Sequence, residues 1–145
     1  MRITLDTNQL VRALMRPPGL ATFIMAWQAK RFTIVGSVEL LEEYEAVLAY
    51  PEIAELIYPE LRRIFFNHLR DEIALVVLPD VPAVCRDPDD DKVIATAIIG
   101  MVDYLATDDD DLRSRQVAEI LQREGIALIT IDEILHMLDQ QASTN

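Results

Sequence analysis

The chain has 145 residues, of which 51% are hydrophobic and 26% are charged, and its formal net charge is −12 at pH 7. This length and apolar content predict one folded domain and exclude an intrinsically disordered chain. A balance this acidic argues against the broad basic surface that nucleic-acid-binding proteins commonly present.

The first 72 residues alternate between short apolar runs and helical patterns. They predict a strand, a helix capped by Thr7 or Asn8, a second helix after a break at 17–19, and a further strand that ends at Gly36. A helix capped by Ser37 and a helical stretch interrupted near Pro59 follow. These elements cover residues 3–6, 8–14, 20–27, 32–35, 38–48 and 52–72.

The second half of the chain opens with a continuous apolar run that predicts a buried strand. Asp87 followed by Pro88 marks the start of a helix that is apolar on most sides, and Gly125 ends a later helix. The elements of this half cover residues 73–78, 88–99, 103–106, 117–123, 126–129 and 132–138.

Strands that alternate with helices predict an α/β fold with a parallel sheet covered on both faces. We expect a three-layer α/β/α architecture around a central, mainly parallel sheet of about five strands. The sequence shows no repeat and no linker, so we predict a single domain over residues 1–139, followed by a tail at 140–145.

The location of the protein is predicted from what its segments lack. No run reaches the roughly 20 apolar residues of a membrane span, and the N-terminus lacks the apolar run of a signal peptide. The single cysteine, Cys85, excludes a disulfide within the chain and is typical of a reducing compartment. We therefore expect a cytoplasmic protein that does not associate with membranes.

The acidic residues are concentrated in one part of the chain. Nine of the 25 lie between residues 86 and 111, where the only basic residues are Arg86 and Lys92. Clustered carboxylates repel one another unless a cation keeps them ionised. The charge therefore indicates a local site rather than a general property of the surface.

Three groups of carboxylates are predicted to meet at one edge of the sheet. Asp6 follows the first strand, residues 108–111 follow the fourth, and residues 89–91 lie in the first turn of the apolar helix. Ligands of such sheets bind beyond the carboxyl ends of the strands. Carboxylates without a partnered His or Cys are typical ligands of Mg²⁺ or Mn²⁺, and a pair of such ions can promote hydrolysis of a phosphodiester.

Each of these acids also has a purely structural interpretation. Asp6 can cap the first helix, residues 89–91 can complement a helix dipole, and residues 108–111 can form a solvated loop. Glu43 lies at the edge of the apolar stripe of its helix, and the pattern alone leaves its role open.

Four segments of the chain together have a characteristic order and spacing. They are Ile3–Asn8, Ser37–Glu43, Arg86–Lys92 and Ala106–Leu112. They resemble the PIN domain, in particular the prokaryotic branch of VapC-like toxins of toxin–antitoxin systems, and the resemblance extends to about residue 138. It implies an endoribonuclease, a hydrolase of RNA phosphodiesters that depends on Mg²⁺ or Mn²⁺.

Carried over residue by residue, the resemblance implies a set of carboxylates and supporting polar groups. This branch usually has an uncharged residue where the chain has Asp108, which leaves the register of Asp108 against Asp109 open. The implied catalytic and metal-binding residues are Asp6, Glu43, Asp91 and Asp109, with Asp111 as a further metal ligand. The implied supporting residues are Asn8, Thr107 and Asp89.

The implied mechanism needs no covalent nucleophile from the protein. The hypothesis is that the bound ion acidifies a water molecule and stabilises the departing oxygen. Cys85 is expected to be an ordinary buried thiol. His68 and His136 lie outside the four segments, and we expect them to be a surface helix residue and a last-turn helix residue.

Two other functions compete with the nuclease. A phosphatase that forms an aspartyl-phosphate needs a second Asp two residues after Asp6, where the chain has Asn8, and a nearby lysine, for which Lys92 is the candidate. A receiver-like signalling domain also lacks the second acid. The other rival is a non-catalytic PIN-fold binding module, although degenerate PIN domains usually lose the acids that this chain retains.

The expected partners follow from the resemblance and the charge. They are an RNA substrate, a small and often basic antitoxin that fits the acidic surface, and a second copy of the chain. Exposed apolar residues on the second helix and on the helix over 52–72 are candidates for the dimer face. Both a toxin and a housekeeping nuclease are compatible with these motifs. The candidate phosphate contacts are Arg12, Arg16, Arg113 and Arg115.

Overall fold

The computed structural model describes residues 1–15, 17–79, 88–110 and 112–144. Five strands form one sheet in the order β3-β2-β1-β4-β5, and every neighbouring pair is parallel. The predicted α/β class and the sheet of about five strands are thereby confirmed. The strands are β1 (Arg2–Leu5), β2 (Thr33–Ser37), β3 (Ala74–Val76), β4 (Tyr104–Ala106) and β5 (Ala127–Ile129).

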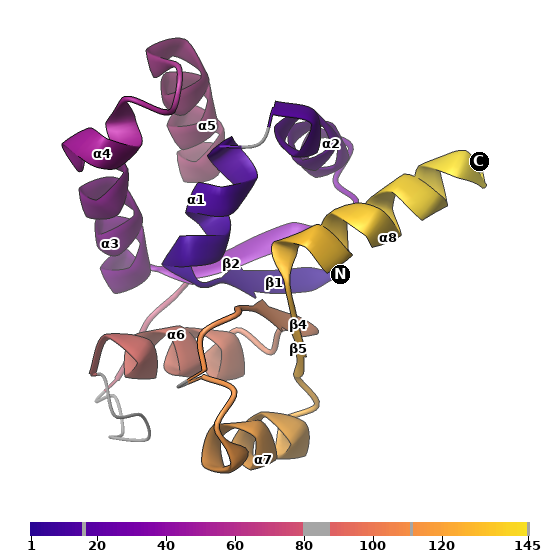
Figure 1. The fold of residues 1–145 in the computed structure, drawn as a ribbon. Helices are drawn as coiled ribbons and strands as arrows, with labels where there is room; N and C mark the ends of the chain where they lie inside the picture. The colour runs from indigo at the N-terminus through magenta and orange to yellow at the C-terminus, as the bar shows by residue number, and fades with distance from the viewer. Residues whose placement is uncertain (16, 80–87, 111, 145) are drawn as a thin grey trace.

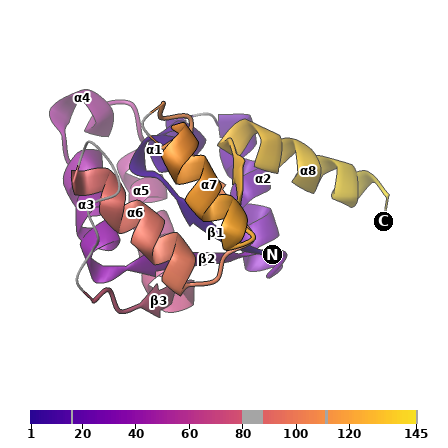
Figure 2. The same cartoon turned by 90° about the horizontal axis from the view of Figure 1, so that it is seen from below.

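Helices cover both faces of this sheet. They are α1 (Thr7–Met15), α2 (Pro17–Gln28), α3 (Val38–Leu48), α4 (Pro51–Ala54), α5 (Pro59–Glu72), α6 (Pro88–Ile99), α7 (Arg115–Arg123) and α8 (Ile131–Ser143). Figure 1 shows α6 and α7 below the sheet and the other helices on the opposite side. Figure 2, seen from below, shows α6 and α7 in front of the strands. The three-layer α/β/α arrangement is therefore confirmed.

The core forms where the central strands are covered from both sides. Ile3 and Leu5 of β1 and Ile34 and Val35 of β2 are all buried. A group of rings from α2, β2 and their surroundings extends this core on the side of the larger helical layer, where Trp27 stacks at 6.4 Å from the Phe32 ring. Burial of this apolar surface is the main favourable contribution to folding.

The strand register brings the carboxyl ends of β1 and β4 to the same level. Leu5 pairs with Ala106, so Asp6 and Thr107 are the first residues beyond the paired strands. The amide of Asp6 donates to the carbonyl of Ala106 at 2.9 Å, which continues the pairing by one step. This edge is where ligands bind in open parallel sheets.

Two helix starts differ from the sequence prediction. Thr7 and Asn8 lie inside α1 and do not cap it, and Asp6 precedes the helix, with its carbonyl accepting from the amides of Gln9 and Leu10. Helix α2 begins at Pro17 itself, because proline lacks only an amide hydrogen that the first helical turn leaves unpaired. The predicted cap at Ser37 is confirmed, since its side chain accepts from the amide of Leu40.

The strand predicted as buried over residues 73–78 is wrong in extent and environment. β3 covers only three residues at the edge of the sheet, beside β2, and Leu75 is 53% exposed. Val77, beyond the strand, is 88% exposed. An apolar run by itself does not distinguish an edge strand from a central one.

Three expectations about the remaining elements also need correction. Helix α8 runs to Ser143, so residues 140–143 are helical, although a tail was predicted there, and His136 is not in its last turn. His68 is only partly exposed: its ring packs edge-on against Trp27, with 4.3 Å between ring centroids. Cys85 and Asp87 lie outside the described residues.

Within the described ranges, no helix combines the length and apolar character needed to cross a bilayer.

Gly100, at the end of α6, should be the glycine most sensitive to an added methyl group. A Cβ there would meet the side chain of Val35 and come within 2.9 Å of the Thr96 carbonyl oxygen, whereas a Cβ on Gly36 would meet only the flexible end of Ile73 at 2.6 Å. We expect Gly100→Ala to lower the free energy of unfolding by about 1–3 kcal/mol in urea titrations. Gly36→Ala is the matched control with a smaller loss, and equal losses would contradict this account.

Candidate active site

Asp6 occupies the carboxyl end of the central strand, and its side chain is almost enclosed. The residue is only 6% exposed. Thr107, at the end of β4, donates its hydroxyl to Asp6 Oδ2 at 3.0 Å. The pKa of Asp6 is nevertheless raised from 3.8 to about 6. Burial is the main cause, the charges of Asp109 and Glu43 add to it, and hydrogen bonds from Thr107 and Thr7 act in the opposite direction.

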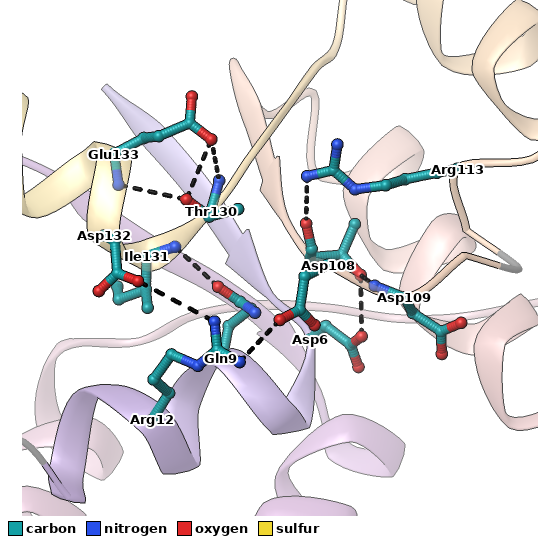
Figure 3. Close-up of polar contacts among 11 residues, drawn as sticks. Asp6, Gln9, Arg12, Asp108, Asp109, Arg113, Thr130, Ile131, Asp132 and Glu133 are labelled. Carbon is teal, nitrogen blue, oxygen red and sulfur yellow. Dashed lines mark hydrogen bonds and ion pairs between the residues drawn. The ribbon is translucent and has the colours of Figure 1, made fainter.

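Thr107 joins the two acids that follow neighbouring strands. While its hydroxyl donates to Asp6, the same oxygen accepts from the amide of Asp109 at 3.1 Å. The threonine is fully buried, so this oxygen holds the start of the loop after β4 against the end of β1. Figure 3 shows the Asp6 and Asp109 side chains on the same side of this contact.

Asp108 and Asp109 have different surroundings. Asp108 Oδ2 forms an ion pair with Arg12 Nη2 of α1 at 2.9 Å, and Arg12 also lies 4.0 Å from the carboxylate of Asp132 at the start of α8 (Figure 3). Asp109, in contrast, is the neighbour whose charge acts on Asp6. Of these two residues, Asp109 is the one whose charge raises the pKa of Asp6 and whose amide is bonded to Thr107, the residue that also holds the Asp6 carboxylate.

Glu43 reaches the same region from α3. Its Oε2 accepts from the hydroxyl of Thr7, the residue directly after Asp6, and its Oε1 forms an ion pair with Lys92 Nζ at 3.0 Å. The following residue, Tyr44, donates its buried hydroxyl to the carbonyl of Leu5. Because the tyrosine is completely buried and close to Asp6 and Glu43, its pKa is raised well above the usual range. Helix α3 is thus attached to both sides of the Asp6 backbone.

Asp91 lies near the start of α6 and is only 5% exposed. The helix is attached to the end of β2 by a hydrogen bond of 3.0 Å between the hydroxyls of Ser37 and Thr96, and to α3 by the Lys92–Glu43 ion pair. Asp91 therefore belongs to the helical turn that reaches Glu43.

The predicted arginines are not equivalent. Arg12 is paired with Asp108, and Arg113 donates to the carbonyl of Thr107 at 2.8 Å, so both lie at the rim of the acidic region. Arg115 is bonded to Glu119 of its own helix and its side chain is 94% exposed. Arg16 lies outside the described residues.

The structure describes less about the remaining predicted site residues, which are Asn8, Asp89 and Asp111. Asn8 is exposed and lines an open pocket of about 490 Å³ with Arg12, Asp108 and two apolar side chains of α1. The hydrogen bonds given for the Asp6 side chain come from the Thr107 hydroxyl and the Thr7 backbone, so the predicted role of Asn8 in orienting that carboxylate stays a prediction. Asp111 and the side chain of Asp89 fall outside the part of the chain that the structure describes.

The carboxylates around Asp6 are suited to a hard divalent cation, but the number of them that can share one ion is limited. Among the described residues, no three His, Cys, Asp or Glu side chains gather closely enough to hold one ion between them. Mg²⁺, however, keeps several waters and is commonly bound by one or two carboxylates together with the phosphate of its substrate. Asp6 and Asp109, held to one threonine oxygen, fit that mode, because a cation would stabilise the ionised form of Asp6, whose pKa is raised by burial and by the neighbouring charges.

Sequence reasoning missed the contacts that orient these acids. The sequence predicted Thr7 only as a helix cap and Lys92 only as part of a rival phosphatase site, and it gave no sign that Tyr44 contacts the backbone next to Asp6. Gln9 is a further case: it is fully buried on α1 and accepts from the amide of Ile131 at 2.7 Å, which attaches the start of α8 to the helix after Asp6. The sequence offered one sign of this contact, which is a Gln within the otherwise apolar stripe of the first helix.

Asp6 should make the metal-free protein less stable as the pH rises. Its pKa of about 6 in the folded state exceeds the ordinary 3.8, so its contribution to stability is complete below about pH 4 and is lost as the pH rises through 6. Between pH 4 and 7.5, in a chelator, wild type should lose up to about 3 kcal/mol of unfolding free energy relative to Asp6→Asn. Asp110→Asn, at an exposed position, is the control. A gap between wild type and Asp6→Asn that is the same at both pH values would contradict the assignment.

Comparison with known proteins assigns the family. A model of the PIN domain matches residues 2–111, which include the Asp6, Glu43, Asp91 and Asp109 segments but end before the expected limit near residue 138. The search of curated proteins found no match. PIN domains are in general nucleases, and their substrates are RNA or other nucleic acids. With the match covering most of its length, the chain belongs to the PIN-domain family.

Proposed function

We propose that the chain is a metal-dependent endoribonuclease whose active site is the acidic edge around Asp6. The observation that supports this most strongly is the pair formed by Asp6 and Asp109 on Thr107. Two carboxylate residues from the ends of neighbouring strands share one buried hydroxyl, and one of them carries a pKa raised to about 6 by burial and by its neighbours. Such an arrangement favours a bound cation, which keeps the carboxylates ionised.

In this proposal Asp6 and Asp109 hold one Mg²⁺ or Mn²⁺, and Asp91 and Glu43 are further carboxylates at the α6 and α3 sides of the site. Asp111 remains a proposed further ligand, and Asp89 and Asn8 remain proposed supporting residues. A divalent ion there supplies Lewis-acid stabilisation to the phosphodiester and makes a water molecule more acidic. Thr107 orients the Asp6 carboxylate and holds the backbone of Asp109 beside it, which reduces the reorganisation needed when the ion binds.

The substrate phosphate needs positive charge at the rim of an acidic protein. Arg12 and Arg113 are the proposed phosphate contacts, because their side chains are attached to Asp108 and to the Thr107 carbonyl beside the acids. Arg16 and Arg115 were predicted for the same role. Arg115 bonds within α7, so its contribution is expected to be weaker.

The first test is cleavage of RNA by the purified chain with Mn²⁺ or Mg²⁺. We expect Asp6→Asn and Asp109→Asn each to lower the cleavage rate by about 100-fold or more, because the site binds less well the cation that stabilises negative charge at the reacting phosphate. Excess chelator should abolish cleavage by wild type, and an added divalent ion should restore it.

Asp110→Asn is the matched control, since it removes an exposed acid one residue from Asp109 and should leave the rate unchanged. Cleavage that persists in folded Asp6→Asn and Asp109→Asn would refute the site. Tight Mn²⁺ binding without cleavage of any RNA in a diverse set would instead favour the non-catalytic binding module.

We further propose that the protein acts as the toxin of a toxin–antitoxin pair, with a small basic antitoxin as its partner. The net charge of −12 favours a basic partner. A homodimer is proposed on weaker grounds, from exposed apolar side chains such as Met25 on α2 and Leu61 and Ile64 on α5. A monomer mass in light scattering at high concentration would count against the dimer.

The toxin role predicts an effect on growth that depends on the active site. Induced expression of wild type in a bacterial host should arrest growth within a few generations, whereas Asp6→Asn expressed to the same level should not. Growth should recover on co-expression of a small basic protein encoded next to this gene. Normal growth with active wild-type enzyme present would favour a housekeeping nuclease.

A further inference from the structure

Lys92 brings a positive charge into the acidic site from within the chain. It follows Asp91 on α6, and its ammonium lies 3.0 Å from Glu43 Oε1, with both side chains only 20% exposed. The chain has one other lysine, Lys30, which is exposed at the end of α2. An ion pair that is mostly removed from water is screened less than a surface pair and is held in place more firmly.

Both carboxylate oxygens of Glu43 already have donors from the protein. Thr7 donates to Oε2, and Lys92 donates to Oε1. A carboxylate that binds a metal directly gives at least one oxygen to the ion, and here that would require breaking the contact with Lys92 or Thr7. The absence of a group of three metal-binding side chains among the described residues agrees with this, because Glu43 is engaged with a lysine and a threonine.

We propose that Lys92 takes the place of the second divalent cation, so that the chain binds one metal ion and uses the Lys92 ammonium as the other positive charge at the phosphate. This inference rests on the proposed nuclease function. Two-metal sites use the second ion to stabilise developing charge in the displacement, and a lysine close to a phosphate supplies the same kind of stabilisation as a point charge. Glu43 is then a positioning residue for Lys92 and is not a metal ligand.

The test counts Mn²⁺ ions bound by the full chain, using isothermal titration calorimetry and the electron paramagnetic resonance signal of free Mn²⁺. Wild type should bind one ion. Lys92→Met should bind two, because the lost ammonium releases Glu43 Oε1 and leaves the acids without their internal counter-charge. Lys92→Arg and the control Lys30→Met should each bind one.

A variant that keeps the net charge tests the role of Glu43 directly. In Lys92→Met with Glu43→Gln, both partners of the ion pair become neutral, so the net charge of the site does not change. We therefore expect one Mn²⁺ to bind, with a Kd within about threefold of wild type, a range that corresponds to about 0.7 kcal/mol. The double variant also provides a test if Lys92→Met alone does not fold, because it leaves no Glu43 carboxylate without its lysine. Circular dichroism confirms folding of each variant.

The outcomes separate this inference from the function on which it rests. Three results would each overturn the role of Lys92. Wild type could bind two ions, folded Lys92→Met could bind one ion, or the double variant could bind Mn²⁺ with a Kd tenfold higher than that of wild type. None of these results affects the nuclease, which depends on the cleavage and metal binding lost in Asp6→Asn. Wild type that binds no Mn²⁺ would overturn both.

Discussion

The burial of the Asp6 carboxylate at the end of β1 is the constraint on which the rest of the site depends. β1 is the middle strand of five, so helices and neighbouring strands enclose the residue that follows it. Removing a carboxylate from water is costly, and the pKa of about 6 reflects that cost. The hydroxyl of Thr107 offsets part of it, and for this the ends of β1 and β4 must lie at the same level. A parallel pairing with Leu5 opposite Ala106 provides that alignment.

The acids around Asp6 each bind a different partner in the protein. Glu43 is paired with Lys92 and Asp108 with Arg12, while Asp109 is held by its backbone to Thr107. These different partners explain how so many carboxylates can lie at one edge of a chain with a net charge of −12. The acids with cationic partners face α6 and α1, whereas in the described part of the chain Asp6 accepts from hydroxyl and amide donors. A divalent ion beside Asp6 would stabilise its ionised form.

The C-terminal helix takes part in the site although the family match ends before it. Gln9 of α1 accepts from the amide of Ile131, and Arg12 lies between Asp108 and Asp132 (Figure 3). The first turn of α8 is thereby attached to the helix that begins after Asp6. Loss of α8 would therefore disturb the position of Arg12 at the rim, and with it the orientation of Asp108, in addition to exposing the apolar face that α8 covers.

The amino-acid sequence by itself determined the alternation of strands and helices, the cap at Ser37 and the grouping of acids after the first and fourth strands, because apolar periodicity, capping residues and charge are local properties of the chain. It also supported the PIN-domain assignment. Only the tertiary structure decided that β3 is an exposed edge strand, that Asp108 pairs with Arg12 while the amide of Asp109 is bonded to Thr107, and that Glu43 is bound to Lys92. These depend on strand order and on contacts between residues far apart along the chain, such as positions 43 and 92, and local patterns carry no information about such distances.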